Sequence, residues 1–422
     1  MPNQVTPKGA WVQMLMLFLY MVINFADKLV LQIASVPMMA ELNLSPEAYG
    51  AIGSYFFLCL SIAGVVVGFV ANRVSASFLI LLMGVSWALV QFPMVLSVSF
   101  TTIVIFRMLL GLGEGGASSV AVHHLYKWFP DQHRAVPTAL LSQGAAIGVV
   151  FAAPALTWVV VNVSWHAAFG ALGAVGLVWT LCWWLIGREG PLVEPAAIVD
   201  RADRVPYAAL IFSRTFIGCV IATFGAYWSL SLGLTWFVPF AVQGLGFSQT
   251  ASGYLTILPW GVGAITVIAG GVISQLLTAR GVSTRVSRGL VGTIPLAIGG
   301  CFTLMLPFAP DAATEIALLM IGTGLTGPIY VVCAPMLGEF IPDGQRAGMI
   351  ATYGALYAIS AILAPSVMGY LVQHGATLLS GYQRGFMVAA AVQLSCALIG
   401  MVLLAPAVDR ARIARLRALP AS

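Results

Sequence analysis

The stretch TTIVIFRMLLGLGEGGASSVAV, residues 101–122, is apolar over a length that crosses a lipid bilayer, yet it carries Arg107 and Glu114. A charge at bilayer depth costs at least ~2.5 to 3.5 kcal/mol on insertion scales and is usually functional. Seven residues are two helical turns, so both side chains are expected on one helix face. The alternatives are a structural ion pair, or an Arg107 side chain that reaches the membrane surface.

The same apolar character extends along the whole chain. Of its 422 residues, 60% are hydrophobic and 8% are charged, whereas soluble domains carry about 25% charged residues. Only helices satisfy the backbone of such segments within lipid. The sequence therefore predicts an all-α membrane protein of twelve transmembrane helices in two six-helix halves. The predicted spans are 11–36, 49–71, 77–98, 101–123, 137–160, 166–187, 213–240, 251–277, 289–307, 313–338, 347–373 and 384–406.

An internal repeat relates the two halves. The segment FPDQHRA at 129–135 recurs as IPDGQRA at 341–347, a shift of 212 residues, and GLGEGG at 111–116 aligns with GTGLTG at 322–327. Duplication of this kind is typical of transporters whose halves move about a central site. The predicted domains are an N-terminal bundle at 1–187, a cytoplasmic linker at 188–206 and a C-terminal bundle at 207–422.

The charged residues of the spans are concentrated in the first half. Asp27 and Lys28 lie inside the first apolar run, while leucines, Leu325 among them, stand where the repeat would place Arg107 and Glu114. Intramembrane ionisable groups mark ion or substrate pathways. We expect Glu114 to gain and lose a proton as access changes, and Lys28 and Arg107 to balance the negative charge of an anion.

Four uncharged side chains are further candidates for substrate binding. Gln143 offers an amide to hydroxyl or carboxylate groups, although a hydrogen bond between helices explains it equally well. Tyr330, Tyr353 and Tyr357 come from the second half, and the last two lie one helical turn apart. Packing is the stronger explanation for aromatic residues in membrane helices.

Basic residues predict the orientation. With the N-terminus inside, the lysines and arginines of the connecting segments fall on the cytoplasmic side, and Arg384 alone falls outside. This asymmetry places both termini in the cytoplasm. The net charge of +5 is therefore a topology signal and not a nucleic-acid footprint, because the basic residues never form one patch.

These residues resemble the anion:cation symporters of the major facilitator superfamily, which include vesicular glutamate transporters and bacterial sugar-acid transporters. The similarity rests on FADK at 25–28, Arg107 through Glu114, KWFP at 127–130 and LPW at 258–260. In that family the residue matching Glu114 is implicated in proton coupling, and the carboxylate matching Asp27 is a second candidate proton site. The base matching Lys28, usually an arginine, contacts the substrate anion.

The predicted function is secondary active transport, the proton-coupled symport of a small organic carboxylate anion by alternating access. A passive uniporter of a small uncharged solute is the alternative, since the fold permits it. An enzyme is not expected, because the chain has no HExxH, GxSxG or Cys/His cluster. No metal or cofactor is expected either, as the six cysteines lie in apolar runs without CxxC spacing.

The predicted surroundings follow from the same observations. We expect a monomer in the bacterial cytoplasmic (inner) membrane, with the lipid bilayer, protons and a small organic anion as partners and no nucleic acid.

Overall fold

The computed structural model describes residues 6–71, 73–96, 98–192 and 205–417. The chain divides into two compact units. Unit 1 comprises Met1–Pro195 and Leu234–Ile257, and unit 2 comprises Ala196–Gly233 and Leu258–Ser422. Residues 193–204 of the predicted linker lie outside the described residues, so the predicted domain limits stay a prediction.

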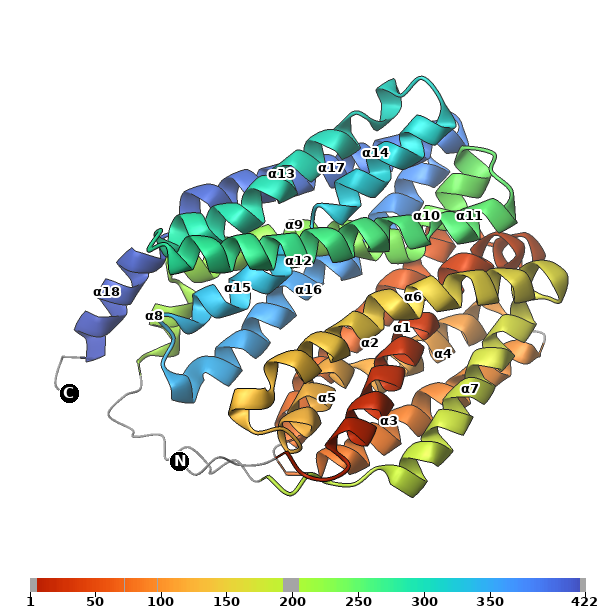
Figure 1. The fold of residues 1–422 in the computed structure, drawn as a ribbon. Coiled ribbons are helices and arrows are strands. Elements are labelled where there is room, and N and C mark those ends of the chain that lie inside the picture. The colour runs from red at the N-terminus through yellow and green to blue at the C-terminus, as the bar shows by residue number, and fades with distance from the viewer. Residues whose placement is uncertain (1–5, 72, 97, 193–204, 418–422) are drawn as a thin grey trace. The chain divides into compact units, whose positions relative to one another are not determined.

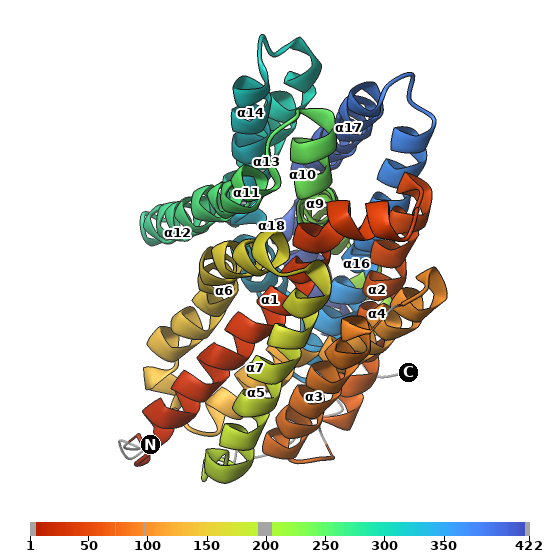
Figure 2. The same cartoon turned by 90° about the vertical axis from the view of Figure 1, so that its right-hand side faces the viewer.

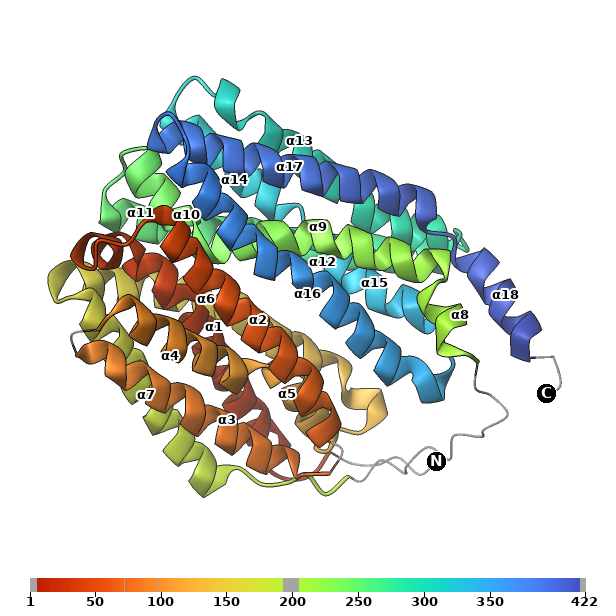
Figure 3. The same cartoon turned by 180° about the vertical axis from the view of Figure 1, so that it is seen from behind.

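Unit 1 contains the first six membrane spans, the residues between the seventh and eighth spans, and the first turns of the eighth (Figure 1). Its helices are α1 (Ala10–Glu41), α2 (Pro46–Val70), α3 (Ala76–Gln91), η1 (Phe92–Val95), α4 (Phe100–Glu114), α5 (Ala117–Tyr126), η2 (Asp131–His133), α6 (Ala135–Asn162), α7 (Trp165–Ile186), α10 (Phe237–Pro239), η4 (Phe240–Gly244) and α11 (Gln249–Leu255). Helix α1 packs along α6, and α2 packs along α4 (Figure 3).

Unit 2 holds most of the seventh and eighth spans and all of the later ones, with α13 packed along α17 and beside α14 (Figure 2). Its helices are α8 (Tyr207–Ile211), most of α9 (Arg214–Thr235), α12 (Ile257–Ala279), η5 (Arg285–Leu290), α13 (Val291–Leu304), η6 (Leu306–Phe308), α14 (Ala312–Gly324), α15 (Pro328–Gly338), α16 (Asp343–Gln373), α17 (Leu378–Leu403) and α18 (Pro406–Arg417).

The twelve-span fold class is confirmed. Within the described residues, twelve helices are long and apolar enough to cross a membrane, and each overlaps one of the predicted runs. Polar capping residues define where several helices begin. A serine side chain there accepts a hydrogen bond from a backbone N–H group that has no partner within the helix. In unit 1 the capping residues are Ser45, Ser75, Ser99, Ser164 and Ser248.

The fourth span is broken at the glycine-rich segment. Helix α4 ends at Glu114, and Gly116 adopts a left-handed backbone with φ 87° before α5 begins. Glycine reaches this conformation without the penalty that a Cβ imposes. The repeat breaks at the matching place, since α14 ends at Gly324 and α15 begins at Pro328. The duplicated pattern therefore specifies a duplicated interruption, and Glu114 is the last residue before it.

Small residues allow close helix contacts in unit 1. A Cβ added at Gly144 would lie 2.7 Å from the Met21 Cβ, and one at Gly148 would lie 2.7 Å from the Val22 carbonyl oxygen. Both positions join α6 to α1. In lipid, such close backbone packing contributes association energy that the hydrophobic effect cannot supply.

Matching arginines close the fourth and tenth spans. Arg134 Nη2 donates to the Tyr126 carbonyl at 3.1 Å, and Arg346 Nη2 donates to the Gly338 carbonyl at 2.9 Å. These donors and acceptors are related by the same shift of 212 residues. A cation at a helix C-terminus satisfies unpaired carbonyls and interacts favourably with the helix dipole.

Replacing Gly148 with alanine is expected to lower the unfolding temperature, because the new methyl group would press against the backbone of α1. Overpacking of this kind costs about 1 to 3 kcal/mol. The control is Gly271→Ala in α12, where nothing lies within 4 Å of the added carbon. Thermal unfolding of both variants in detergent measures the effect, and similar unfolding temperatures would contradict it.

Candidate substrate and proton site

One face of α1 carries a stripe of polar side chains. Asn24, Lys28 and Gln32 are four residues apart, so they follow one another on consecutive helical turns. Tyr20 continues the stripe and packs its ring against Trp87 at 4.6 Å. Asn24 and Gln32 are buried, and the Lys28 side chain is nearly so. The stripe therefore faces the interior of unit 1 and not lipid.

Lys28 forms an ion pair with Glu114. Its Nζ lies 2.5 Å from Glu114 Oε2 and 2.6 Å from Asn24 Oδ1. The Lys28 ammonium also lies over the Phe25 ring, 5.0 Å from its centroid. The Glu114 side chain is fully buried, so the pair is held where water cannot screen it.

Asp27 and Arg107 are placed by different contacts. The Asp27 carboxylate accepts a hydrogen bond from Gln91 Nε2 at 2.8 Å. Arg107 Nη1 donates to the Asp27 main-chain oxygen at 3.2 Å, and the guanidinium lies 4.7 Å from the Phe56 ring centroid. Arg107 is buried, which contradicts a side chain that reaches the membrane surface. The structure thus brings the four predicted charges into one cluster on α1 and α4.

Two donors in this cluster have no hydrogen-bond partner among the described residues. They are Arg107 Nε and Gln32 Nε2. A buried polar group without a partner costs about 1 to 3 kcal/mol. Donors of this kind pair with a group that carries acceptor oxygens, such as a carboxylate.

The uncharged candidates lie apart from this cluster in the chain. Gln143 is partly buried in α6 of unit 1. In unit 2, the Tyr353 hydroxyl lies 2.6 Å from Thr223 Oγ1, and the Tyr357 ring packs edge-on against Tyr353 at 5.0 Å. The Tyr330 hydroxyl is buried and has no hydrogen-bond partner among the described residues.

The sequence analysis did not identify several residues of the charge cluster in unit 1 and of the tyrosine group in unit 2. Asn24 and Gln32 are detectable in retrospect, since they share the spacing of four with Lys28. Gln91 and Phe56 give no such signal, because helix packing alone brings them to Asp27 and Arg107. Tyr227, whose ring lies 5.0 Å from that of Tyr357, also belongs to the aromatic group of unit 2.

Twelve apolar helices with a buried, internally paired charge cluster define an integral membrane protein of the transporter class. Residues 16–325 match the model of the Major Facilitator Superfamily, and the chain belongs to this family. It is accordingly a transporter and not an enzyme.

The relatives are anion transporters, which confirms the family resemblance predicted from the sequence. A protein of Bacillus subtilis (strain 168) named hexuronate transporter is 27% identical over 410 residues, covering 92% of this chain and 94% of the relative. A D-galactonate transporter of Escherichia coli O6:H1 is 25% identical over 391 residues, covering 86% of this chain and 89% of the relative.

A solved structure supports the fold. The bacterial homologue of the human lysosomal transporter Spinster superposes with a TM-score of 0.76 at 18% identity, covering 99% of this chain and 100% of that chain. At this identity the similarity extends to the fold alone.

The Lys28–Glu114 pair is expected to behave as one energetic unit. Lys28→Met and Glu114→Gln each leave a buried charge without its counterion, which costs about 3 to 5 kcal/mol. The double variant leaves neither charge, so its loss of stability should be smaller than the sum of the two single losses. Thermal unfolding of the four proteins completes this cycle, and additive losses would argue against the pair.

Proposed function

We propose that the protein is a proton-coupled symporter of a small organic carboxylate anion. The observation that carries this proposal is the Lys28–Glu114 ion pair. When Glu114 is ionised, its carboxylate is paired with the Lys28 ammonium group, so that group is not available to a substrate anion. Protonation of Glu114 removes its negative charge and leaves Lys28 available to the substrate carboxylate.

Charge balance supports the same coupling. Asp27 and Glu114 together cancel Lys28 and Arg107, so the cluster is neutral when all four groups are ionised. An added monoanion would leave a net negative charge among buried groups, which is costly in a medium of low dielectric constant. Uptake of one proton with the anion restores neutrality. Symport of one proton with one monoanion follows from this balance.

Each residue of the cluster then has a role. Lys28 binds the carboxylate as a point charge, and Arg107 donates from its unpartnered Nε. Glu114 is the main site of the coupled proton, and Asp27, which Gln91 orients, is a second site that shares it. As the substrate leaves and Glu114 loses its proton, the ion pair with Lys28 forms again.

The substrate class we propose is a polyhydroxylated carboxylic acid. Hexuronate and galactonate, the substrates named for the two relatives, are sugar acids of this kind. Gln143 and the hydroxyls of Tyr330, Tyr353 and Tyr357 would bind the hydroxyl groups. The buried Tyr330 hydroxyl without a hydrogen-bond partner supports this assignment.

The proposed setting is the bacterial cytoplasmic membrane, with both termini in the cytoplasm and a monomer as the working unit. The distribution of basic residues supports this orientation. Transport would proceed by alternating access, in which the site is open first to one side of the membrane and then to the other.

Glu114→Gln is expected to abolish accumulation driven by a pH gradient while exchange of substrate between the two sides continues. The glutamine keeps the shape of the side chain but carries no exchangeable charge. Uptake of sugar acids into proteoliposomes, with and without a pH gradient, measures accumulation, and counterflow measures exchange. Gradient-driven accumulation by the variant would remove Glu114 from the coupling role. Uptake by the wild type that ignores the gradient would favour a passive uniporter.

Asp27→Asn tests the second proton site. If anion binding takes up protons, the affinity of the wild type rises as the pH is lowered below neutral. The slope of affinity against pH should be smaller in Asp27→Asn, since one of the two proton sites is lost. Calorimetric titration at several pH values measures both slopes. Equal slopes would leave Asp27 with a structural role and assign the coupling to Glu114.

A further inference from the structure

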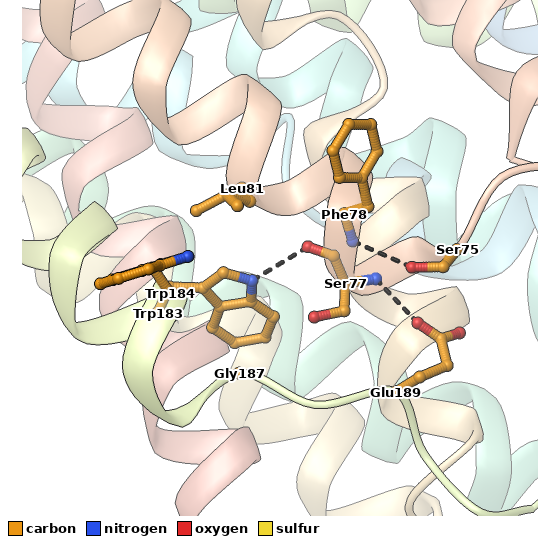
Figure 4. A pocket seen from close by; sticks show the side chains of 8 residues that line it. All are labelled: Ser75, Ser77, Phe78, Leu81, Trp183, Trp184, Gly187 and Glu189. Carbon is orange, nitrogen blue, oxygen red and sulfur yellow. Dashed lines mark hydrogen bonds between the residues drawn. The ribbon is translucent and has the colours of Figure 1, made fainter.

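A second candidate site lies in unit 1, where α3 begins and α7 ends. It is a cavity of about 280 Å³ (Figure 4). From α3 it is lined by Ser77, Phe78 and Leu81, and from α7 and the residues after it by Trp183, Trp184 and Glu189. None of these residues belongs to the cluster around Lys28.

A carboxylate and an ammonium group meet beside this cavity. Glu189 accepts a hydrogen bond from the Ser77 backbone N–H at 2.9 Å, and its Oε1 lies 2.5 Å from Lys127 Nζ. Burial raises the pKa of Glu189, but the hydrogen bonds from Lys127 and Ser77 and the charge of Lys127 lower it more. The net effect is a pKa below the ordinary value. Glu189 is therefore ionised at neutral pH.

Aromatic rings form much of the remaining wall. Trp183 is fixed by a hydrogen bond from its indole N–H to the Ser77 carbonyl at 3.0 Å, as Figure 4 shows. Trp184 and Phe78 are exposed at the rim. Aromatic faces combined with a carboxylate attract ammonium groups, because the ring quadrupole presents a negative face.

The surface next to the cavity is apolar. Leu82 of α3 and Leu181 and Leu185 of α7 are exposed. Both helices are membrane spans, and the cavity lies where α3 begins and α7 ends. Exposed leucines on a membrane span face lipid chains, whereas Glu189 and Lys127 require a polar environment. The occupant should therefore have a polar head at the membrane boundary and acyl chains along α3 and α7.

We propose that this cavity binds the head group of a zwitterionic aminophospholipid, phosphatidylethanolamine. Its ammonium group would lie between Glu189 and the aromatic rings, and its phosphate would lie near Lys127. The paired charges of the site complement a head group that also carries both charges. Phosphatidylglycerol has no ammonium group for Glu189, and the choline of phosphatidylcholine has no N–H to donate to a carboxylate.

The repeat supplies a comparison in unit 2. At the shift of 212 residues Lys127 is matched by Glu339, whose carboxylate is held by Arg288 at 2.6 Å and by Arg410. The position that is basic in unit 1 is thus acidic in unit 2, and two guanidinium groups pair with the carboxylate. Glu339→Gln is a matched control, because it removes a paired carboxylate at the corresponding end of unit 2.

Native mass spectrometry of the full-length protein, mixed with equal amounts of phosphatidylethanolamine, phosphatidylglycerol and phosphatidylcholine, tests the proposal. We expect the wild type to retain phosphatidylethanolamine several-fold over the other two lipids. Glu189→Gln should abolish this preference, and so should Leu81→Trp, which fills the cavity and keeps both charges. Glu339→Gln and Trp158→Leu, which removes an exposed indole of α6, should keep it.

The binding measurements either support or overturn the proposed lipid site. Loss of the preference in each folded cavity variant, with both controls unchanged, supports the site, and Leu81→Trp carries the test if Glu189→Gln does not fold. Equal retention of the three lipids by the wild type would overturn the proposal. A preference that survives in either folded cavity variant would also overturn it.

Discussion

A charge without a counterion is not tolerated inside a membrane span, and the interior of unit 1 is arranged around this constraint. The Lys28–Glu114 pair lies at the centre of this arrangement, because each residue is the counterion of the other and neither charge is stable there when unpaired. Asn24 completes the ammonium coordination, while Gln91 and Phe56 hold the neighbouring charges. The polar cluster is thereby stabilised in largely buried surroundings.

Backbone geometry places this pair. The break at Gly116 ends α4 at Glu114, so the carboxylate stands where the helix is interrupted. Helix α1 carries Lys28 in the middle of an unbroken span. Its close contact with α6, through Gly144 and Gly148, fixes the face that α1 turns inward. The position of the charges therefore depends on the glycines, since a change in the packing of α1 against α6 would move Lys28 relative to Glu114.

Much of this arrangement could be predicted from the sequence, and the reason is the period of the helix. Span positions follow from long apolar runs, and the approach of Arg107 and Glu114 to one cluster follows from their spacing of seven. Partner choice could not be predicted. Asp27 and Lys28 are adjacent in the chain, yet one bonds to Gln91 and the other to Glu114. Adjacent helical residues point about 100° apart, and which neighbour each meets depends on the rotation of α1 against helices distant in sequence.

Whether a group binds a proton is set by its surroundings and not by its residue type, so the roles of the site residues stay predictions. The second half illustrates the same limit. The Tyr353 hydroxyl is hydrogen-bonded to Thr223, while the Tyr330 hydroxyl has no hydrogen-bond partner among the described residues. The presence of a tyrosine in the sequence of a membrane helix does not indicate which of these two states its hydroxyl adopts.

Under the proposed symport, the balance of two acids and two bases in unit 1 also determines which energy source the carrier can use. If a monoanion enters with one proton, the empty and the loaded site carry the same charge, and the cycle is electroneutral. The membrane potential then does no work on it. A pH difference of one unit supplies about 1.4 kcal/mol, a tenfold concentration ratio. A dianion with one proton would move charge against an inside-negative potential, at about 2.3 kcal/mol per 100 mV. Under the proposed symport, monoanionic acids are therefore the cargo that this cluster is suited to concentrate.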